Sequence, residues 1–150
     1  MKVYRYMSRE EFTKLINGTS LHNPTVRDTD YSTSCGFCFL AETTTFVTFN
    51  FDGEEQTFEY TPEDCSSFLG GIVTEEVLVE FEVMDPQLLR SDFATYMNPI
   101  STEYEETIYI TEYSCHTYDR TVLRPLRYKL CKPNGYTYWD RMPWIQVSDV

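Results

Sequence analysis

The chain is 150 residues long, about the length of one ordinary domain, and 41% of its residues are hydrophobic, which is enough to build one core. Its 24 Asp and Glu residues against 12 Lys and Arg residues give a formal net charge of −12. This surplus of acids argues against a nucleic-acid-binding protein and against docking on anionic membranes, because both need concentrated basic side chains. We therefore expect a single domain over residues 1–150, either an acidic enzyme or a protein that binds a basic partner surface.

Short segments of the sequence bear on localisation and cysteine use. No apolar run approaches the roughly 20 residues that cross a bilayer, and residues 1–6 alternate in polarity, unlike a signal peptide. A cytoplasmic protein is therefore expected. The five cysteines are odd in number and lie in or beside apolar runs, which favours reduced thiols over a disulfide framework.

Two alternatives to free thiols involve these cysteines. Cys35 and Cys38 have the C-x-x-C spacing of a redox motif, but the run around them is strand-like and offers no helix N-terminus to lower a thiol pKa. The same two cysteines, with Cys115 and His116, have side chains that suit zinc. However, Cys115 and His116 are adjacent and would point to opposite faces of a strand. We therefore expect buried free thiols and no metal site.

The N-terminal segment predicts a strand followed by a helix. Residues 3–7 alternate between the two faces of a strand. Ser8 then begins a capping box with Glu11, in which the Ser8 hydroxyl accepts from the Glu11 amide and the Glu11 carboxylate reaches back to the Ser8 amide. An apolar helix face follows, and Gly18 ends the helix.

The middle of the chain predicts strands, a loop and a second short helix. Residues 19–34 are rich in turn formers and predict a loop, whereas the aromatic and β-branched runs at 36–40 and 46–49 are strand candidates. A hydroxyl cap, a first-turn proline and two acids predict a helix over 61–71. Alternating apolar residues over 77–83 give the clearest strand of the sequence.

The last third of the chain adds two strand candidates, at 106–113 and 122–130. Pro125 makes the second of them bulged or an edge strand. Residues 132–150 contain a Pro-Asn-Gly turn and several aromatic side chains, so we expect them to pack onto the sheet or to rim a site. Early helices and mostly late strands predict the α+β class.

Arg5 is the first candidate for a functional role. If Val3 and Met7 face the core, the two-residue period of a strand points Arg5 the same way, and a guanidinium there needs an anionic partner. Two partners are open. One is a carboxylate of the protein, in a structural salt bridge, and the other is a ligand phosphate, which a planar five-donor group binds well.

Two further patterns offer chemistry to a site. Ser32-Thr33-Ser34 precedes a strand candidate and presents three hydroxyls toward a ribose or an amide, although such residues are also common in loops. Glu103-Tyr104-Glu105-Glu106 leads into a strand whose alternation places Glu106 on the face shared by Ile108 and Ile110. That carboxylate would look into any cleft of the sheet; a solvated acidic loop is the alternative.

In chain order, an Arg on the first strand, a Ser-Thr-Ser before a second strand and a Glu-x-Glu entering a late strand resemble the Arg-Ser-Glu class of ADP-ribosyltransferases. The match lies on Arg5, Ser32-Thr33-Ser34 and Glu103-Tyr104-Glu105 or Glu106. The opening over residues 4–12 and the run Gly36-Phe37-Cys38-Phe39 also resemble small phage and prophage proteins of ADP-ribosyltransferase-like fold. The resemblance covers the chain from residue 3 to about residue 113.

This resemblance implies a split β-sandwich that binds NAD as a substrate in a central cleft and transfers ADP-ribose to a protein or small-molecule acceptor, in the host cytoplasm if the protein is phage-encoded. A glutamate there would stabilise the oxocarbenium-like cation that forms as nicotinamide leaves. The NAD-binding residues that it implies are Arg5, Tyr6, Ser32, Thr33, Ser34 and Phe37, and the catalytic ones are Glu103, Glu105 and Glu106.

The register of these glutamates bears on the acceptor. Glu103 and Glu105 have the two-residue spacing of families that modify arginine. Counted from the strand at 107–110, however, the main glutamate is Glu106, and Tyr104 stands two residues before it. In that register we expect another acceptor, or hydrolysis of NAD, instead of arginine modification.

The main alternative is a non-catalytic acidic interaction protein, such as a phage inhibitor that covers the basic, nucleic-acid-binding surface of its target. The acidic charge and the small size favour it, because complementary potentials steer association. A third hypothesis is a nucleotide pocket without turnover. For an anionic dinucleotide to bind at all, the cleft of this acidic protein must be locally positive.

Overall fold

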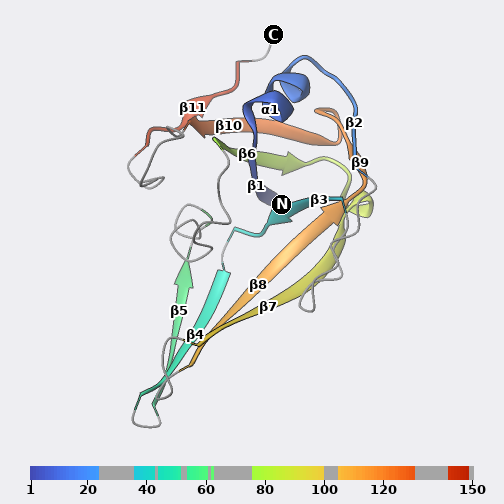
Figure 1. The fold of residues 1–150 in the computed structure, drawn as a ribbon. Helices are drawn as coiled ribbons and strands as arrows, with labels where there is room; N and C mark the ends of the chain where they lie inside the picture. The colour runs from blue at the N-terminus through green and yellow to red at the C-terminus, as the bar shows by residue number, and fades with distance from the viewer. Residues whose placement is uncertain are drawn as a thin grey trace.

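The computed structural model describes residues 1–23, 36–42, 44–51, 54–60, 62, 76–99, 105–130 and 142–148. This part of the chain forms one α-helix, a short 3-10 helix and eleven strands (Figure 1). In chain order they are β1 (Lys2–Met7), α1 (Arg9–Ile16), β2 (Leu21–His22), β3 (Phe37–Leu40), β4 (Thr44–Phe51), β5 (Glu54–Tyr60), β6 (Val77–Val83), η2 (Pro86–Leu88), β7 (Arg90–Pro99), β8 (Glu105–Cys115), β9 (Thr117–Tyr118), β10 (Leu123–Leu130) and β11 (Ile145–Gln146). Over these ranges no helix is long and apolar enough to span a bilayer.

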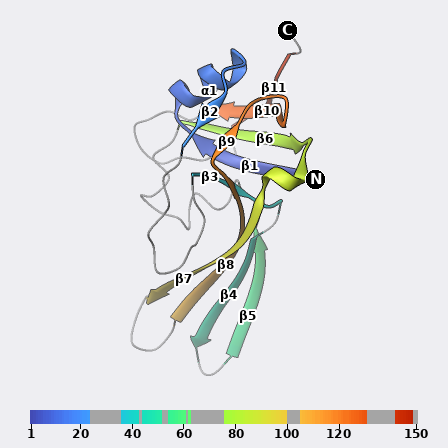
Figure 2. The ribbon, with the colours of Figure 1, turned by 90° about the vertical axis from the view of Figure 1, so that its right-hand side faces the viewer.

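Nine of the strands form one antiparallel sheet. Its order is β11-β10-β6-β1-β3-β8-β4-β5, and β7 pairs with β8 in addition. The strands β2 and β9 form a separate pair. Helix α1 lies at the end of the sheet that contains β1, β6 and β10, whereas β4, β5, β7 and β8 project away from it as a long arm (Figures 1 and 2). The fold is therefore α+β and mostly antiparallel sheet, as the sequence predicts.

All six predicted strands are present, as β1, β3, β4, β6, β8 and β10, and the predicted helix after Ser8 is α1. The bulged alternative for the last strand is confirmed, because the register between β10 and β6 shifts between Pro125 and Arg127. The second predicted helix, over 61–71, lies outside the described residues apart from Pro62.

The sequence pattern misses β5 and β7 and is wrong about the start of the loop at 19–34. Strand β5 is rich in Glu, and β7 ends in Asn98 and Pro99, so neither has the composition of a strand. Strand β7 instead forms because ten of its residues pair with β8. Leu21 and His22 are not loop but β2, which is paired with β9.

Helix α1 begins as the capping pattern predicts. Ser8 has extended backbone dihedrals, and its Oγ accepts a hydrogen bond from the Glu11 amide at 3.1 Å. The expected second hydrogen bond, from the Ser8 amide to the Glu11 carboxylate, is wrong. That carboxylate turns inward and accepts hydrogen bonds from Arg5 and Tyr118, because a nearly buried guanidinium attracts it more strongly than a backbone amide does.

One face of the sheet carries the hydrophobic core. Every second residue of β6 points to this face, as the two-residue period of a strand predicts, and all of these residues are buried: Val77, Val79, Phe81 and Val83. The rings of Phe39, Phe81 and Tyr118 meet edge to face, with centroids between 5.3 and 6.0 Å apart. Helix α1 covers this face and adds Leu15 to the same cluster.

The opposite face of the sheet buries polar side chains. In the described chain the buried polar residues are Glu80, Glu112, Ser114 and Lys129. Directly opposite residues of antiparallel strands share a face, and Glu80 is opposite Tyr4 of β1 and Arg127 of β10. The register of the neighbouring strands places the other three on the same face. The centre of the sheet therefore has an apolar side and a side with buried charge.

Candidate functional site

Arg5 lies on the core face and is engaged by the protein itself. Its Nε and one terminal nitrogen donate to the two Glu11 oxygens at 2.7 and 2.8 Å, and the other terminal nitrogen donates to the Cys38 carbonyl at 3.1 Å. The guanidinium carbon also lies 5.0 and 5.8 Å from the ring centroids of Phe37 and Phe39. Of the two partners that the sequence leaves open, the structure shows a carboxylate of the protein.

The Arg5 ion pair extends to Tyr118, whose hydroxyl donates to Glu11 at 2.8 Å. Burial disfavours the charge of Arg5, but the hydrogen bonds and the charge of Glu11 outweigh burial and raise the pKa of Arg5. Burial and the nearby Glu11 also raise the pKa of Tyr118, so its hydroxyl stays protonated and donates. These three residues connect β1, α1 and β9, which is a structural role.

Glu105 and Glu106, at the start of β8, lie far from Arg5. Arg5 contacts β3 at Cys38, which is opposite Ser114 of β8, and Glu106 precedes Ser114 by eight residues. At about 3.3 Å per residue this separation is about 26 Å along the strand. Figures 1 and 2 agree, since β8 begins at the far end of the arm. Arg5 and Glu106 therefore do not line one cleft.

The other residues that the resemblance implies lie in several places. Glu105 and Glu106 are the first two residues of β8 and pair with the end of β7. Tyr6 lies on the polar face, where its hydroxyl donates to the Pro62 carbonyl, whereas Phe37 is buried on the core face. Outside the described residues lie Ser32, Thr33, Ser34 and Glu103. Of the described members, Arg5 and Phe37 lie together, whereas Tyr6, Glu105 and Glu106 lie elsewhere, so the set does not form one site.

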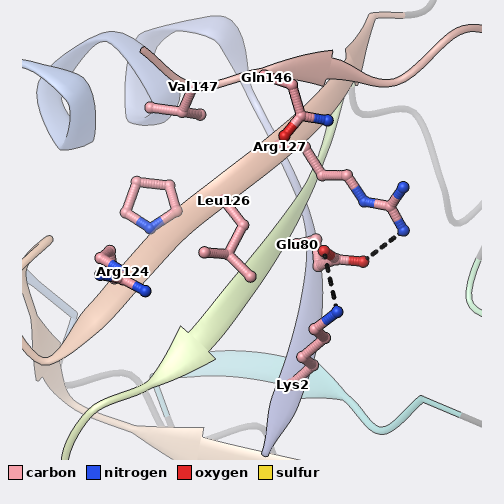
Figure 3. Close-up of a pocket in the computed structure, with 8 residues that line it drawn as sticks. Lys2, Glu80, Arg124, Leu126, Arg127, Gln146 and Val147 are labelled. Atoms are coloured by element: carbon pink, nitrogen blue, oxygen red, sulfur yellow. Dashed lines mark hydrogen bonds and ion pairs between the residues drawn. The ribbon is translucent and has the colours of Figure 1, made fainter. Parts of the chain in front are cut away.

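A groove on the polar side gathers basic side chains instead (Figure 3). It involves β1, β6, β10 and the C-terminal segment at β11, and its volume of about 530 Å³ lies in the range of small-molecule sites. Its charged and polar lining consists of Lys2, Glu80, Arg124, Arg127 and Gln146. We call it the basic groove.

Glu80 is the centre of the charge network in the basic groove. Although its side chain is only 2% exposed, its Oε2 accepts hydrogen bonds from the Tyr4 hydroxyl and from Arg127, each at 2.8 Å. Lys2 Nζ lies 3.9 Å from Oε1. Burial disfavours the carboxylate, but the hydrogen bonds from Arg127 and Tyr4 outweigh it and hold the pKa of Glu80 below its usual value. Burial and Glu80 together raise the pKa of Tyr4, so the phenol remains a donor.

Acid is expected to weaken this network. Because the pKa of Glu80 is lowered in the folded state, its contribution to stability is present above the unfolded value of about 4.3 and is lost as the pH falls through the folded pKa. Glu80→Gln should therefore lower the free energy of unfolding at neutral pH, and its difference from the wild type should shrink below about pH 4. Urea denaturation between about pH 3 and pH 7 measures this effect. A difference that stays constant over the range would contradict it.

The basic groove is locally positive in an acidic protein. Three of the twelve Lys and Arg residues of the chain line it with the Glu80 carboxylate. A second carboxylate, Glu82, is opposite Lys2 and Arg124 in register and forms an ion pair with the N-terminal amine. The Arg124 side chain is exposed and forms no hydrogen bond or ion pair with the rest of the described structure. Arg127 donates to Glu80 through one terminal nitrogen, and its guanidinium carbon lies 4.3 Å from the ring centroid of Trp144. Arg124 and part of Arg127 thus remain for an external anion.

No sequence motif predicts this site as a whole, although one of its residues stands out in the sequence. Glu80 interrupts the apolar run of β6, and a buried carboxylate needs cationic partners. Arg124 and Arg127 supply cations in the last predicted strand, but only the register of β10 against β6 shows that Arg127 is opposite Glu80. The expected packing of the C-terminal aromatic residues is confirmed at Trp144, which contacts Arg127 and, at 6.4 Å between ring centroids, Tyr4.

A smaller pocket beside α1 has a different electrostatic character. Its volume is about 310 Å³, and Phe37, one of the residues expected to bind NAD, lines it together with Leu21 and His22 of β2. Its charged lining consists of Glu10, Glu11 and Lys14. Two carboxylates against one ammonium make it a poor site for a phosphate.

The described cysteines do not form a metal site. Cys38 and Cys115 form no disulfide within the described residues. Cys38 is opposite Ser114 and Cys115 is opposite Phe37, so the two thiols point to opposite faces of the sheet and cannot bind one zinc ion. Within the residues that the structure describes, no group of three His, Cys, Asp or Glu side chains could hold a metal.

Comparison of the chain with family models, with curated proteins and with solved structures gives no match. The basic groove and the sequence motifs are therefore the basis for inferring function.

Proposed function

We propose that the protein binds a phosphate-bearing, anionic small molecule in the basic groove. The observation that carries this function is the gathering of Lys2, Arg124 and Arg127 around a single space in a chain of net charge −12. A guanidinium presents planar pairs of N–H donors that match phosphate oxygens, and Arg124 has no competing partner in the described structure. The groove thus supplies the local positive charge that an anion needs in an acidic protein.

NAD is the first ligand to test, because the sequence resemblance implies it and its pyrophosphate is anionic. In this proposal the fold is an ADP-ribosyltransferase-like split β-sandwich, and the basic groove holds the pyrophosphate in place of Arg5, which is engaged by Glu11. Mono-ADP-ribosyl transfer through Glu106 is a separate hypothesis, whose readout is release of nicotinamide. A nucleotide-binding fold without turnover is compatible with the same groove.

Arg124→Gln is expected to weaken binding of NAD or ADP-ribose about tenfold or more, because it removes charge-assisted hydrogen bonds to phosphate. Isothermal titration calorimetry at low and moderate salt measures the affinity. The matched control is Lys14→Gln, which also removes one positive charge but lies on α1 and lines the other pocket. It should leave the affinity unchanged. The proposal fails if NAD, ADP-ribose and inorganic phosphate all give no heat with the wild-type protein.

A non-catalytic acidic interaction protein is the second candidate. Its supporting observation is again the net charge of −12. Because the basic groove holds three of the twelve basic residues, the rest of the protein carries a larger excess of acidic residues than the whole chain does. Such a protein would capture a basic partner in a salt-sensitive manner. Capture that Arg124→Gln leaves intact, together with no binding of NAD, would favour this candidate.

A further inference from the structure

The floor of the basic groove contains an unused hydrogen-bond acceptor. Both hydrogen bonds to the Glu80 carboxylate, from Tyr4 and Arg127, reach Oε2. Within the described residues Oε1 accepts none, and Lys2 Nζ at 3.9 Å is beyond hydrogen-bond distance. Because the carboxylate is ionised at neutral pH, Oε1 can only accept. A ligand that fills the groove therefore meets an open acceptor at its floor.

Free donors flank this acceptor. Figure 3 shows one terminal nitrogen of Arg127 directed at Glu80 and another directed away from it. Arg124 comes from the same strand on the other side of Leu126, and its guanidinium has no partner within the described part of the chain. The groove thus offers cationic donors for a phosphate and, beside them, an anionic acceptor that would repel a second negative charge.

We propose that the ligand of the basic groove is a phosphorylated sugar, which carries hydroxyl groups close to its phosphate. This inference rests on the proposed function and narrows it. The phosphate contacts the free nitrogen of Arg127, Arg124 on the other side of Leu126 adds a second positive charge, and a sugar hydroxyl donates to Glu80 Oε1. A phosphate ester without hydroxyls leaves Oε1 without a hydrogen-bond donor when the groove is filled, and a buried carboxylate oxygen that lacks a hydrogen bond is unfavourable. Tyr4 is a positioning residue, because its hydroxyl fixes Oε2 and thereby directs Oε1 toward the ligand.

The test compares ribose 5-phosphate with ethyl phosphate, which is a phosphate monoester without hydroxyl groups. In the wild-type protein, calorimetry at one pH and one salt concentration should show ribose 5-phosphate binding about tenfold tighter or more, the effect of one hydrogen bond to a charged group. This comparison needs no variant, so it does not depend on whether a substituted protein folds.

Glu80→Gln then replaces the acceptor at the Oε1 position with a donor. Tyr4 and Arg127 both donate, so they hold the amide oxygen at the place of Oε2, and the amide nitrogen, a donor, takes the place of Oε1. The preference for ribose 5-phosphate over ethyl phosphate should disappear, because the amide nitrogen cannot accept a hydrogen bond from a sugar hydroxyl. Glu80→Asp, which keeps the charge and withdraws the oxygen by one methylene, should also lose the preference.

The outcomes separate this inference from the proposed function. If neither ester binds to the wild type, the proposed function itself fails. If both bind equally, or if Glu80→Gln keeps the preference for ribose 5-phosphate, the inference of a sugar ligand is overturned while binding of a phosphate stands.

Discussion

Gly36→Ala is expected to lower the free energy of unfolding by about 2–5 kcal/mol, the sum of left-handed backbone strain and a forced shift of packed backbone. Gly36 has a φ of +72°, and a Cβ there would lie 2.4 Å from the Cys115 carbonyl oxygen and 2.5 Å from the Asn23 carbonyl oxygen. Both contacts are with backbone, so no side chain can rotate away. The strand that follows, β3, connects β1 to β8, and its displacement would separate the helix-bearing end of the sheet from the arm.

Urea denaturation measures this loss, and Gly18→Ala is the matched control. Gly18 also has a positive φ, +81°, but a Cβ there would meet only the Arg120 Cδ at 3.9 Å, an ordinary van der Waals distance. Its expected loss is therefore the left-handed strain alone, about 1–2 kcal/mol. Equal losses of unfolding free energy in the two variants would show that the close backbone contacts at Gly36 do not contribute to the effect.

The elements that the sequence predicts well are those whose causes are local. The Ser8 cap involves residues three positions apart, and the strand at 77–83 carries its own alternation, so neither needs knowledge of the rest of the chain. Strand β7 has no such pattern, because its stability comes from ten pairs with β8. Its prediction would have required the tertiary structure first.

The candidate site follows the same rule. Alternation correctly predicts that Arg5 faces the core with an anionic partner, but it cannot choose between a carboxylate and a phosphate, because the competing partner is set by where α1 packs. Likewise, Glu80 and Arg127 are 47 residues apart and meet only through the bulged register of β10 against β6. The sequence motifs predict a site at Arg5 and at Glu103, Glu105 and Glu106. The structure instead gathers basic side chains in the basic groove, on the face of the sheet opposite Arg5.

Arg5→Ala is expected to destabilise the protein by about 3–5 kcal/mol, because it leaves the Glu11 carboxylate without its cation in a nearly buried position. The side chains of Arg5 and Glu11 are 15% and 14% exposed, and two hydrogen bonds of 2.7 and 2.8 Å join them. Arg9→Ala is the matched control on α1. Arg9 forms an ion pair with Glu76, but its side chain is 61% exposed, so its loss should be within about 1 kcal/mol.

The double variant Arg5→Met, Glu11→Leu separates a structural role of Arg5 from a ligand-binding role. It removes both charges and keeps apolar volume, so its loss of stability should be much smaller than the sum of the single losses, as for other ion pairs replaced by hydrophobic residues. If Arg5 is structural, this variant binds NAD or ADP-ribose as tightly as the wild type, because the basic groove on the opposite face is untouched. If the double variant folds but no longer binds NAD or ADP-ribose, while Arg124→Gln binds them normally, the phosphate is bound by Arg5 and the assignment to the basic groove is overturned.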